Sequence, residues 1–528
     1  MSLLPAPVPG AATAPPHPRR WAGLAVLSAS LLLVIMDMTI LNVALPAISA
    51  ELRPSSVELL WMVDVYSLVL AGLLVTVSAL GDRWGRKKTL LAGFVLFGLA
   101  SVAVLWASSP GEVIAVRALL GVGGAMIMPS TLSMIRTLFA DPAERATALG
   151  IWAAMAALGS ALGPILGGLL LEYFSWHSAF LVNVPVMVLA VLAGLILLPE
   201  SRNPHPGRWD LVATALSIAG MVALVFSIKQ FVKEGPATPW PWVALTVAAV
   251  TLTWFVQRCL RRPDPLLEIR LFRSRPFSAG TLAALSTSIA MGAVMLLMAQ
   301  WMQLVQGYSP LETGVRMLPA ALGALLLSPL APWLAVRIGT RTVLAGGLAI
   351  SGLGLGVLFA APVVYPWVAV SLLLVGSGMG SLAIASSVIM AGAPLEKAGS
   401  AAAIEETSYE LGGLLGVAVL GSVAAAVYRA ALSSSVSAVE AARDSLGGAI
   451  EVARHAGTAG MELARQAKTA FTASLEVTGL AGALLMLAAA LAIWWLVPRD
   501  FDIVTTPSPS PLSTRTSPPS PKDRRANR

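Results

Sequence analysis

The chain has 528 residues, of which 57% are hydrophobic and only 12% are charged, and its mean hydropathy is +0.80. Soluble proteins carry about 25% charged residues, so this composition excludes an ordinary soluble protein and indicates a chain dissolved in lipid. The net charge of +8 lies mostly in one set of loops and in the basic C-terminal tail, so it predicts no nucleic-acid partner.

Apolar runs of about 20 residues recur along the chain, each long enough to cross about 30 Å of hydrocarbon. We count fourteen and predict an all-α integral membrane protein. The first run is too long for a cleaved signal peptide and contains Asp37, so we expect it to stay as an anchor. The expected spans are 22–45, 58–80, 89–108, 112–135, 146–171, 178–198, 210–230, 241–259, 277–304, 314–336, 341–361, 366–390, 398–427 and 473–497.

Lys and Arg gather on alternate connections between these spans. The connection after the second span has four basic residues in 83–88, whereas the opposite short loops hold little beyond Arg53, Lys233 and Arg316. The positive-inside rule therefore places both termini in the cytoplasm, which requires an even number of spans. This parity agrees with a count of fourteen.

Three segments lie outside the expected spans. Residues 1–21 form a cytoplasmic N-terminal tail, and the Pro/Ser-rich residues 498–528 have the composition of a disordered tail. The long outer segment 428–472 is rich in Ala, Glu and Arg, which predicts one or two amphipathic helices outside the membrane. That segment is either a structured connector or a gating or partner-binding element.

Five carboxylates lie well inside the expected spans, and a charge at the middle of a span costs about 2.5 to 3.5 kcal/mol. They are Asp37 in the first span, Asp64 in the second, and Glu405, Glu406 and Glu410 in the thirteenth. Acidic residues inside membrane spans usually mark pathways for ions, protons or substrates, so the chain is predicted to transport positive charge.

Arg117 is the one basic residue that we place well inside a span, and it needs a carboxylate partner. Asp37 lies at a comparable depth. A fixed structural ion pair and a proton-coupled switch are both compatible with this pairing.

In the thirteenth span, Glu406 and Glu410 share one helical face and Glu405 is turned away by one residue step. Burial and neighbouring like charges favour the protonated form of a carboxyl, so one of these acids is expected to hold either a proton or a cation. The alternative role is hydrogen bonding to neighbouring helices. Trp61 and Tyr409 each neighbour an acid and are candidates for cation–π contacts with an organic cation. Asp64, Glu405, Glu406 and Glu410 are the acids expected to bind that cation.

An internal repeat predicts the architecture. LGDRWGRKKTLL joins spans 2 and 3, and the similar LAVRIGTRTVLA joins spans 10 and 11, eight spans later. Two six-helix halves, 22–198 and 277–497, are therefore expected, with two helices in 210–259 inserted between them.

Several motifs resemble those of the major facilitator superfamily. LGDRWGRKK resembles its signature between spans 2 and 3, although Ser78 replaces the usual leading Gly, and AVRALLGVGGA resembles its span 4 motif. GSALGPILGG resembles the antiporter motif of span 5, and MDMTILNVALP and SWHSAFLVNVP resemble motifs of fourteen-span drug:proton antiporters. WMVDVYSLVLAG, MIMPSTLSMIR and the EETSYELG run make the chain similar to QacA-type exporters of quaternary ammonium compounds.

The resemblance implies a proton-coupled exporter of lipophilic organic cations, a monomer in the bacterial cytoplasmic membrane. It implies no cofactor, and the proton gradient supplies the energy. No GxxxxGK[ST] loop occurs, which argues against ATP as the fuel, and the single Cys259 argues against a Cys-based metal cluster. Export of a dedicated antibiotic or metabolite is the alternative function. A non-transporting receptor or scaffold is disfavoured by the intramembrane acids.

The motifs also imply roles for individual residues. Proton coupling is assigned to Asp37 and Arg117, together with Glu406 in the thirteenth span. The signature residues are either a gate or a determinant of topology, and the span 5 residues are either a hinge or a packing surface. The signature residues are Asp82, Arg83, Gly85 and Arg86, and the span 5 residues are Gly159, Gly163, Pro164 and Gly167.

Ala324 marks a departure from the QacA pattern. QacA-type relatives can carry a further acid in span 10, where this chain has Ala324 and no carboxylate. A dication needs two negative groups, so monovalent cations are expected to be preferred over divalent ones.

Overall fold

The computed structural model describes residues 18–54, 56–202, 209–235, 237–432, 445–455, 457–499 and 501. Fourteen helical segments in this part are long and apolar enough to cross a membrane, from Arg20–Leu41 to Gly460–Leu496. No β-strand occurs among the described residues, so the predicted all-α fold class is confirmed. Residues 1–17 and 502–528, where most of both tails were predicted, lie outside the described residues.

Seventeen α-helices follow one another along the described residues. They are α1 (Arg20–Leu52), α2 (Ser56–Trp84), α3 (Arg86–Ala103), α4 (Pro110–Leu138), α5 (Pro142–Tyr173), α6 (Ser178–Leu181), α7 (Asn183–Leu197), α8 (Leu211–Glu234), α9 (Pro239–Arg261), α10 (Arg275–Gln300), α11 (Pro310–Ile338), α12 (Thr340–Ala360), α13 (Tyr365–Ser377), α14 (Met379–Ala391), α15 (Ala398–Ala431), α18 (Leu446–His455) and α19 (Gly457–Leu496).

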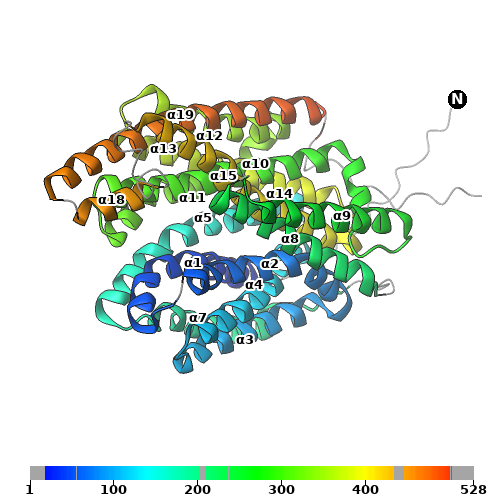
Figure 1. Ribbon diagram of the computed structural model, residues 1–528. Helices are drawn as coiled ribbons and strands as arrows, with labels where there is room; N and C mark the ends of the chain where they lie inside the picture. The colour runs from blue at the N-terminus through cyan, green and yellow to red at the C-terminus, as the bar shows by residue number, and fades with distance from the viewer. Residues whose placement is uncertain are drawn as a thin grey trace, which may run out of the picture.

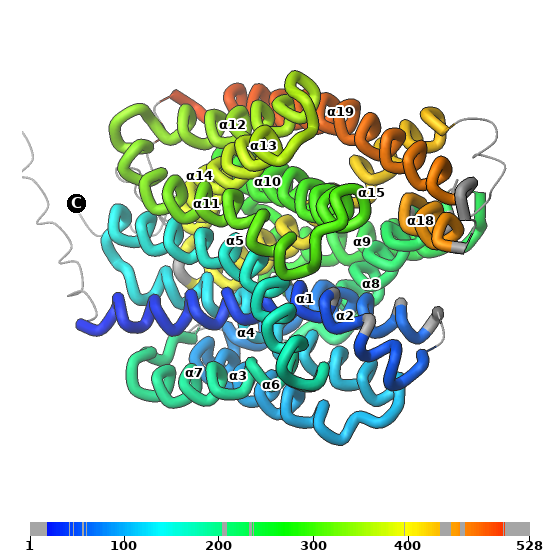
Figure 2. Tube along the Cα trace, turned by 90° about the vertical axis from the view of Figure 1, so that its left-hand side faces the viewer, coloured from blue at the N-terminus to red at the C-terminus, as the bar shows by residue number. Residues whose placement is uncertain are grey.

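The helices form two bundles. The first bundle, α1–α7, and the second bundle, α10–α19, lie on opposite sides of the molecule, with α5 packed on α11 between them (Figures 1 and 2). The hairpin α8–α9 packs against α2 of the first bundle and α15 of the second. The proposed division into two repeats with an inserted pair is compatible with this arrangement.

Three expected spans differ from the observed helices. Span 178–198 is divided into α6 and α7 at Val182, and span 366–390 is divided into α13 and α14 at Gly378. A Cβ at position 378 would overlap the Ser351 hydroxyl, so only glycine allows this approach. The last span begins earlier than expected, because the helix-forming residues from Gly457 onward continue into it as one helix, α19.

The outer segment 428–472 is helical where it is described. It contains the end of α15, all of α18 and the beginning of α19, and α18 packs against α19. Residues 433–444 and 456 of this segment lie outside the described residues.

The span 5 glycines bring α5 close to α1. A Cβ at Gly159 would lie 2.6 Å from the Leu32 carbonyl oxygen, and one at Gly163 would overlap the Thr39 hydroxyl. Pro164 of α5 lies against α11 of the second bundle, because a Cβ at Gly314 of α11 would lie 3.1 Å from the Pro164 Cβ. Small residues thus allow α5 to approach both bundles.

Gly163→Ala is expected to force α1 and α5 apart, because the new methyl group has no space beside Thr39 and Met36. Overpacking of this kind costs about 1 to 3 kcal/mol. We expect a lower thermal stability of the purified protein. Gly421→Ala is the matched control, since a Cβ at Gly421 would have no heavy atom within 4 Å. Equal thermal stability of the two variants would contradict this account.

Candidate functional site

A buried ion pair joins α1 and α4 in the first bundle. Arg117 Nη1 donates to Asp37 Oδ2 at 2.8 Å, and the two side chains are 2% and 0% exposed. The Arg117 guanidinium also lies over the Tyr66 ring, with Cζ 4.4 Å from the ring centroid, and its Nε donates to the Met62 carbonyl at 3.3 Å. The partner predicted for Arg117 is therefore the observed one.

Asn183 completes this site and was not predicted from the sequence. Its Nδ2 donates to Asp37 Oδ1 at 2.7 Å and lies 3.2 Å from the Ser101 hydroxyl. Asn183 is fully buried and is the first residue of α7, so the break after α6 places it beside Asp37. A polar residue within the apolar LVNVP run was the available signal.

Each Asp37 oxygen thus accepts a hydrogen bond from a different helix. In a medium that excludes water, these donors stabilise the ionised carboxylate against the cost of burial. Protonation of Asp37 would weaken its attraction to Arg117 and leave the guanidinium with the Met62 carbonyl and the Tyr66 ring. The site can therefore exist in two charge states with different helix contacts.

A second site is a narrow cavity between the bundles, which in this conformation has room for about one water molecule. Glu405, Glu406 and Tyr409 of α15 line one side. Leu31 and Ile35 of α1, Met128 of α4, Trp152 and Ala156 of α5, and Leu382 of α14 line the rest. Acidic and aromatic side chains thus meet apolar ones, which suits a lipophilic cation.

Two buried carboxylate oxygens in this cavity have no hydrogen-bond partner within the described part of the chain. They are Oε2 of Glu405 and Oε1 of Glu406. The other oxygen of Glu405 accepts a hydrogen bond from the Ser386 hydroxyl of α14. Because buried acceptors are normally satisfied, these two oxygens indicate positions for a proton or a cation.

Two of the three α15 acids line the cavity. Glu405 lines it together with Glu406, whereas Glu410 is not among its lining residues. At about 100° per residue, the side chains around α15 follow in the order Glu405, Tyr409, Glu406 and Glu410. The cavity is lined by the first three, and Glu410 lies next to Glu406 outside this part of the helix surface. Trp61 does not line the cavity either, and its side chain is 42% exposed.

Asp64 has a partner that the sequence did not suggest. Lys229 of α8 forms an ion pair with it, and both side chains are partly buried. The helix α8 also packs against α15, which carries Glu410. Lys229 lies near the end of an expected span, at the start of a KQFVK run, and therefore resembled a loop residue.

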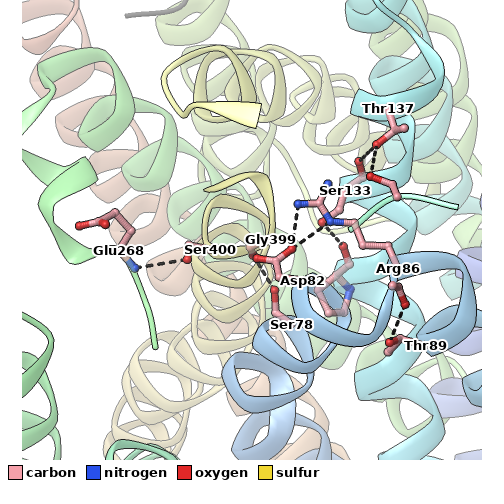
Figure 3. A network of polar contacts seen from close by, with 12 residues as sticks. Ser78, Asp82, Arg86, Thr89, Ser133, Thr137, Glu268, Gly399 and Ser400 are labelled. Carbon is pink, nitrogen blue, oxygen red and sulfur yellow. Dashed lines mark hydrogen bonds and ion pairs between the residues drawn. The ribbon is translucent and has the colours of Figure 1, made fainter. Parts of the chain in front are cut away.

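The signature residues meet the second bundle at one end of the molecule, which we call the signature end and define by Ser78, Asp82, Arg86 and Gly399. Figure 3 shows Asp82 between Arg86 and the beginning of α15. Arg86 Nη2 donates to Asp82 at 2.8 Å, and the Ser78 hydroxyl donates to the Gly399 carbonyl at 2.6 Å. A Cβ at Gly399 would overlap the Asp82 carboxylate, so the contact requires glycine there.

A second hydrogen bond joins the bundles near this end, from the Arg136 guanidinium of α4 to the Ala393 carbonyl after α14. The bundles are therefore tied together at the signature end in this conformation. Ser78, which replaces the usual signature Gly, supplies one of these bonds. A substitution that looks like a departure from the motif thus contributes to the contact.

The other two signature residues have separate roles. Gly85 has φ 116°, a conformation that favours glycine, and allows the chain to turn from α2 into α3. Arg83 lies over the Trp209 ring, with Cζ 5.7 Å from the centroid. Asp82 and Arg86 form an ion pair.

The sequence profile of the Major Facilitator Superfamily matches residues 27–417, about three-quarters of the chain. The chain belongs to this superfamily. It is therefore a multi-pass membrane transporter of that family rather than an enzyme.

Relatives in bacteria share much of the sequence. The chain is 40% identical over 414 residues to the multidrug efflux pump LfrA of Mycolicibacterium smegmatis, which covers 78% of this chain and 82% of that protein. It is 38% identical over 433 residues to the methyl viologen resistance protein SmvA of Salmonella typhimurium, covering 80% and 87%. The crystal structure of the human organic anion transporter MFSD10 has a TM-score of 0.59 at 15% identity, with 90% of this chain and all of that chain covered, and shows a shared fold.

Proposed function

We propose that this transporter exports lipophilic organic cations, including quaternary ammonium antiseptics and dyes, in exchange for protons. The main support for the proposal is the cavity that Tyr409 and Trp152 line together with two acids, each with an oxygen that has no hydrogen-bond partner among the described residues. Acids and aromatic rings in a low-dielectric cavity favour a cation over a neutral or anionic molecule. The multidrug and methyl viologen resistance named for LfrA and SmvA supports the same class of substrate.

In the proposed mechanism, Asp37 and the cavity acids carry out different steps. The Asp37–Arg117 pair takes up or releases a proton and changes the contacts between α1, α4 and α7, while Glu406 binds the cation or a proton in its place. Asp37 lies on α1, which also supplies Leu31 and Ile35 to the cavity. A shift of α1 would therefore change the lining of the cavity in which the substrate binds. Proton binding and cation binding are thereby coupled.

The signature end is proposed to face the cytoplasm and to act as a gate. Fourteen spans place both ends of the described chain on one side of the membrane, and the basic loops favour the cytoplasmic side. In this conformation, the Ser78–Gly399 and Arg136–Ala393 hydrogen bonds tie the bundles together at that end. Export requires these contacts to break so that a cation can enter from the cytoplasm.

The test is proton release from the purified protein on addition of ethidium, followed by uphill dye transport in proteoliposomes with an imposed pH gradient. The proposal expects a proton release that saturates with dye, and dye accumulation that collapses when the gradient is dissipated. If no cation in a panel of dyes and quaternary ammonium compounds releases protons, the dedicated export of an uncharged antibiotic or metabolite becomes the better account.

Ala324→Asp is expected to shift the substrate preference toward divalent cations. Ala324 is fully buried on α11, one turn before Ser328, whose carbonyl packs against Gly150 of α5. An added carboxylate beside α5 would offer a dication a second negative group. The measurement compares efflux of ethidium and of methyl viologen, a dication, with Ala324→Asn as the uncharged control. Equal handling of both dyes by the unmodified protein would show that the existing acids suffice.

A further inference from the structure

The hairpin α8–α9 places a cation between acids of the two bundles. Lys229 on α8 pairs with Asp64 on α2, and the two side chains are 21% and 28% exposed. Glu410 on α15 directly precedes Leu411, which packs against the apolar residues between α2 and α8. The helices that carry these three residues pack against one another, since α8 contacts both α2 and α15.

An apolar seam holds Lys229 in this position. Leu68 and Ala71 of α2 pack with Met221 and Val225 of α8, and Leu411 and Leu414 of α15 pack against them. A Cβ at Gly72 of α2 would lie only 2.8 Å from Val222, which shows how closely α8 approaches α2. Val225 precedes Lys229 by one helical turn, as Asp64 precedes Leu68, so the ion pair lies directly beside the seam.

The apolar seam attaches α8 to both bundles without the ion pair. Within the hairpin, Asp210 just before α8 accepts from Arg258 Nε of α9 at 2.8 Å and lies 3.1 Å from Arg262 Nη1. Partly exposed ion pairs contribute little to stability, and buried ones are often no better than apolar contacts. A lysine in this seam therefore calls for a role other than holding the helices together.

We propose that Lys229 is a tethered counter-ion that occupies the place of a substrate cation between Asp64 and Glu410 and thereby limits the charge of the cations that the transporter accepts. This inference rests on the proposed export of cations. While Lys229 is paired with Asp64, Glu410 is the acid of the two that remains for a substrate. One negative charge suits a monovalent cation. A dication must compete with the lysine for Asp64.

Lys229→Gln should therefore free Asp64 for the substrate. We expect the affinity for methyl viologen relative to ethidium to rise about tenfold, as one additional charge–charge contact would give. Affinities are measured on the purified full-length protein, and efflux of both dyes is measured in proteoliposomes. Lys229→Arg keeps the charge and should keep the original preference, as should Lys468→Gln on α19, which removes a lysine elsewhere.

Asp64→Asn provides an independent arm. It removes the Asp64 partner of Lys229, so the lysine charge would act on Glu410 instead and repel a bound cation. Binding of both dyes should therefore weaken. The double variant Asp64→Asn/Lys229→Gln should recover ethidium binding. This pair of variants still decides the question if Lys229→Gln alone does not fold. A double variant no better than Asp64→Asn, or an unchanged dye ratio in a folded Lys229→Gln protein, would overturn the inference.

The two proposals fail in different ways. If the unmodified protein exports ethidium but the lysine variants do not change the dye ratio, only the role of Lys229 is wrong. If the unmodified protein neither binds nor exports any cation, the proposed function and the inference both fall.

Discussion

Asp37→Asn is expected to abolish uphill export of every substrate while leaving the protein folded in the membrane. Asparagine keeps the shape of the side chain, and one of its side-chain atoms can still bond Asn183 or Arg117. It cannot bind and release a proton, so the pH gradient can no longer drive transport. The measurement is dye accumulation against a concentration gradient in proteoliposomes, where the variant should only equilibrate dye across the membrane.

This prediction needs a control for the loss of the ion pair, which could lower stability by itself. Asp37→Asn leaves Arg117 buried without a carboxylate, which can cost about 3 to 5 kcal/mol. The double variant Asp37→Asn/Arg117→Gln removes that burden and should restore stability without restoring uphill export. Normal uphill export by the single variant would show that Asp37 does not carry the coupling proton.

Glu406→Gln is expected to weaken cation binding about tenfold, equivalent to about 1.4 kcal/mol. Glu406 lines the cavity with an oxygen that accepts no hydrogen bond from the described residues, so a bound cation would be its main partner. Glu405→Gln should have a smaller effect, because the Ser386 hydroxyl already satisfies one oxygen of Glu405. Affinities for ethidium are measured by fluorescence on the purified variants.

Glu476→Gln on α19 is the matched control for this series, since Glu476 is not among the residues that line the cavity. It should leave dye affinity unchanged. Small and equal effects of Glu405→Gln and Glu406→Gln would assign both acids to structure and would remove the main support for cation binding in this cavity.

The sequence alone was sufficient for the membrane fold and for the first ion pair. Fourteen apolar runs predict fourteen spans because an apolar segment of this length has few stable alternatives to a spanning helix. Arg117 and Asp37 could be paired because a buried guanidinium requires a carboxylate and few acids lie at the right depth. The span 5 glycines likewise predicted close packing, which α1 and α5 show.

Other features depended on packing between helices that are distant in sequence. Asn183 reaches Asp37 only because α6 and α7 meet at a break, and Lys229 reaches Asp64 only because α8 lies beside α2. Neither contact has a periodic pattern, since each joins single residues more than 140 positions apart.

The directions of the α15 acids were also determined partly by the sequence and partly by the packing of helices. Their relative angles follow from helical geometry, so the sequence by itself determined which acids can share a face. Which face lines the cavity was decided by the helices against which α15 packs, chiefly α10 and α19, and by α1, α4, α5 and α14, which line the rest of the cavity. A helix fixes angles within itself through its backbone hydrogen bonds, but its rotation about its own axis is set by the neighbours against which it packs.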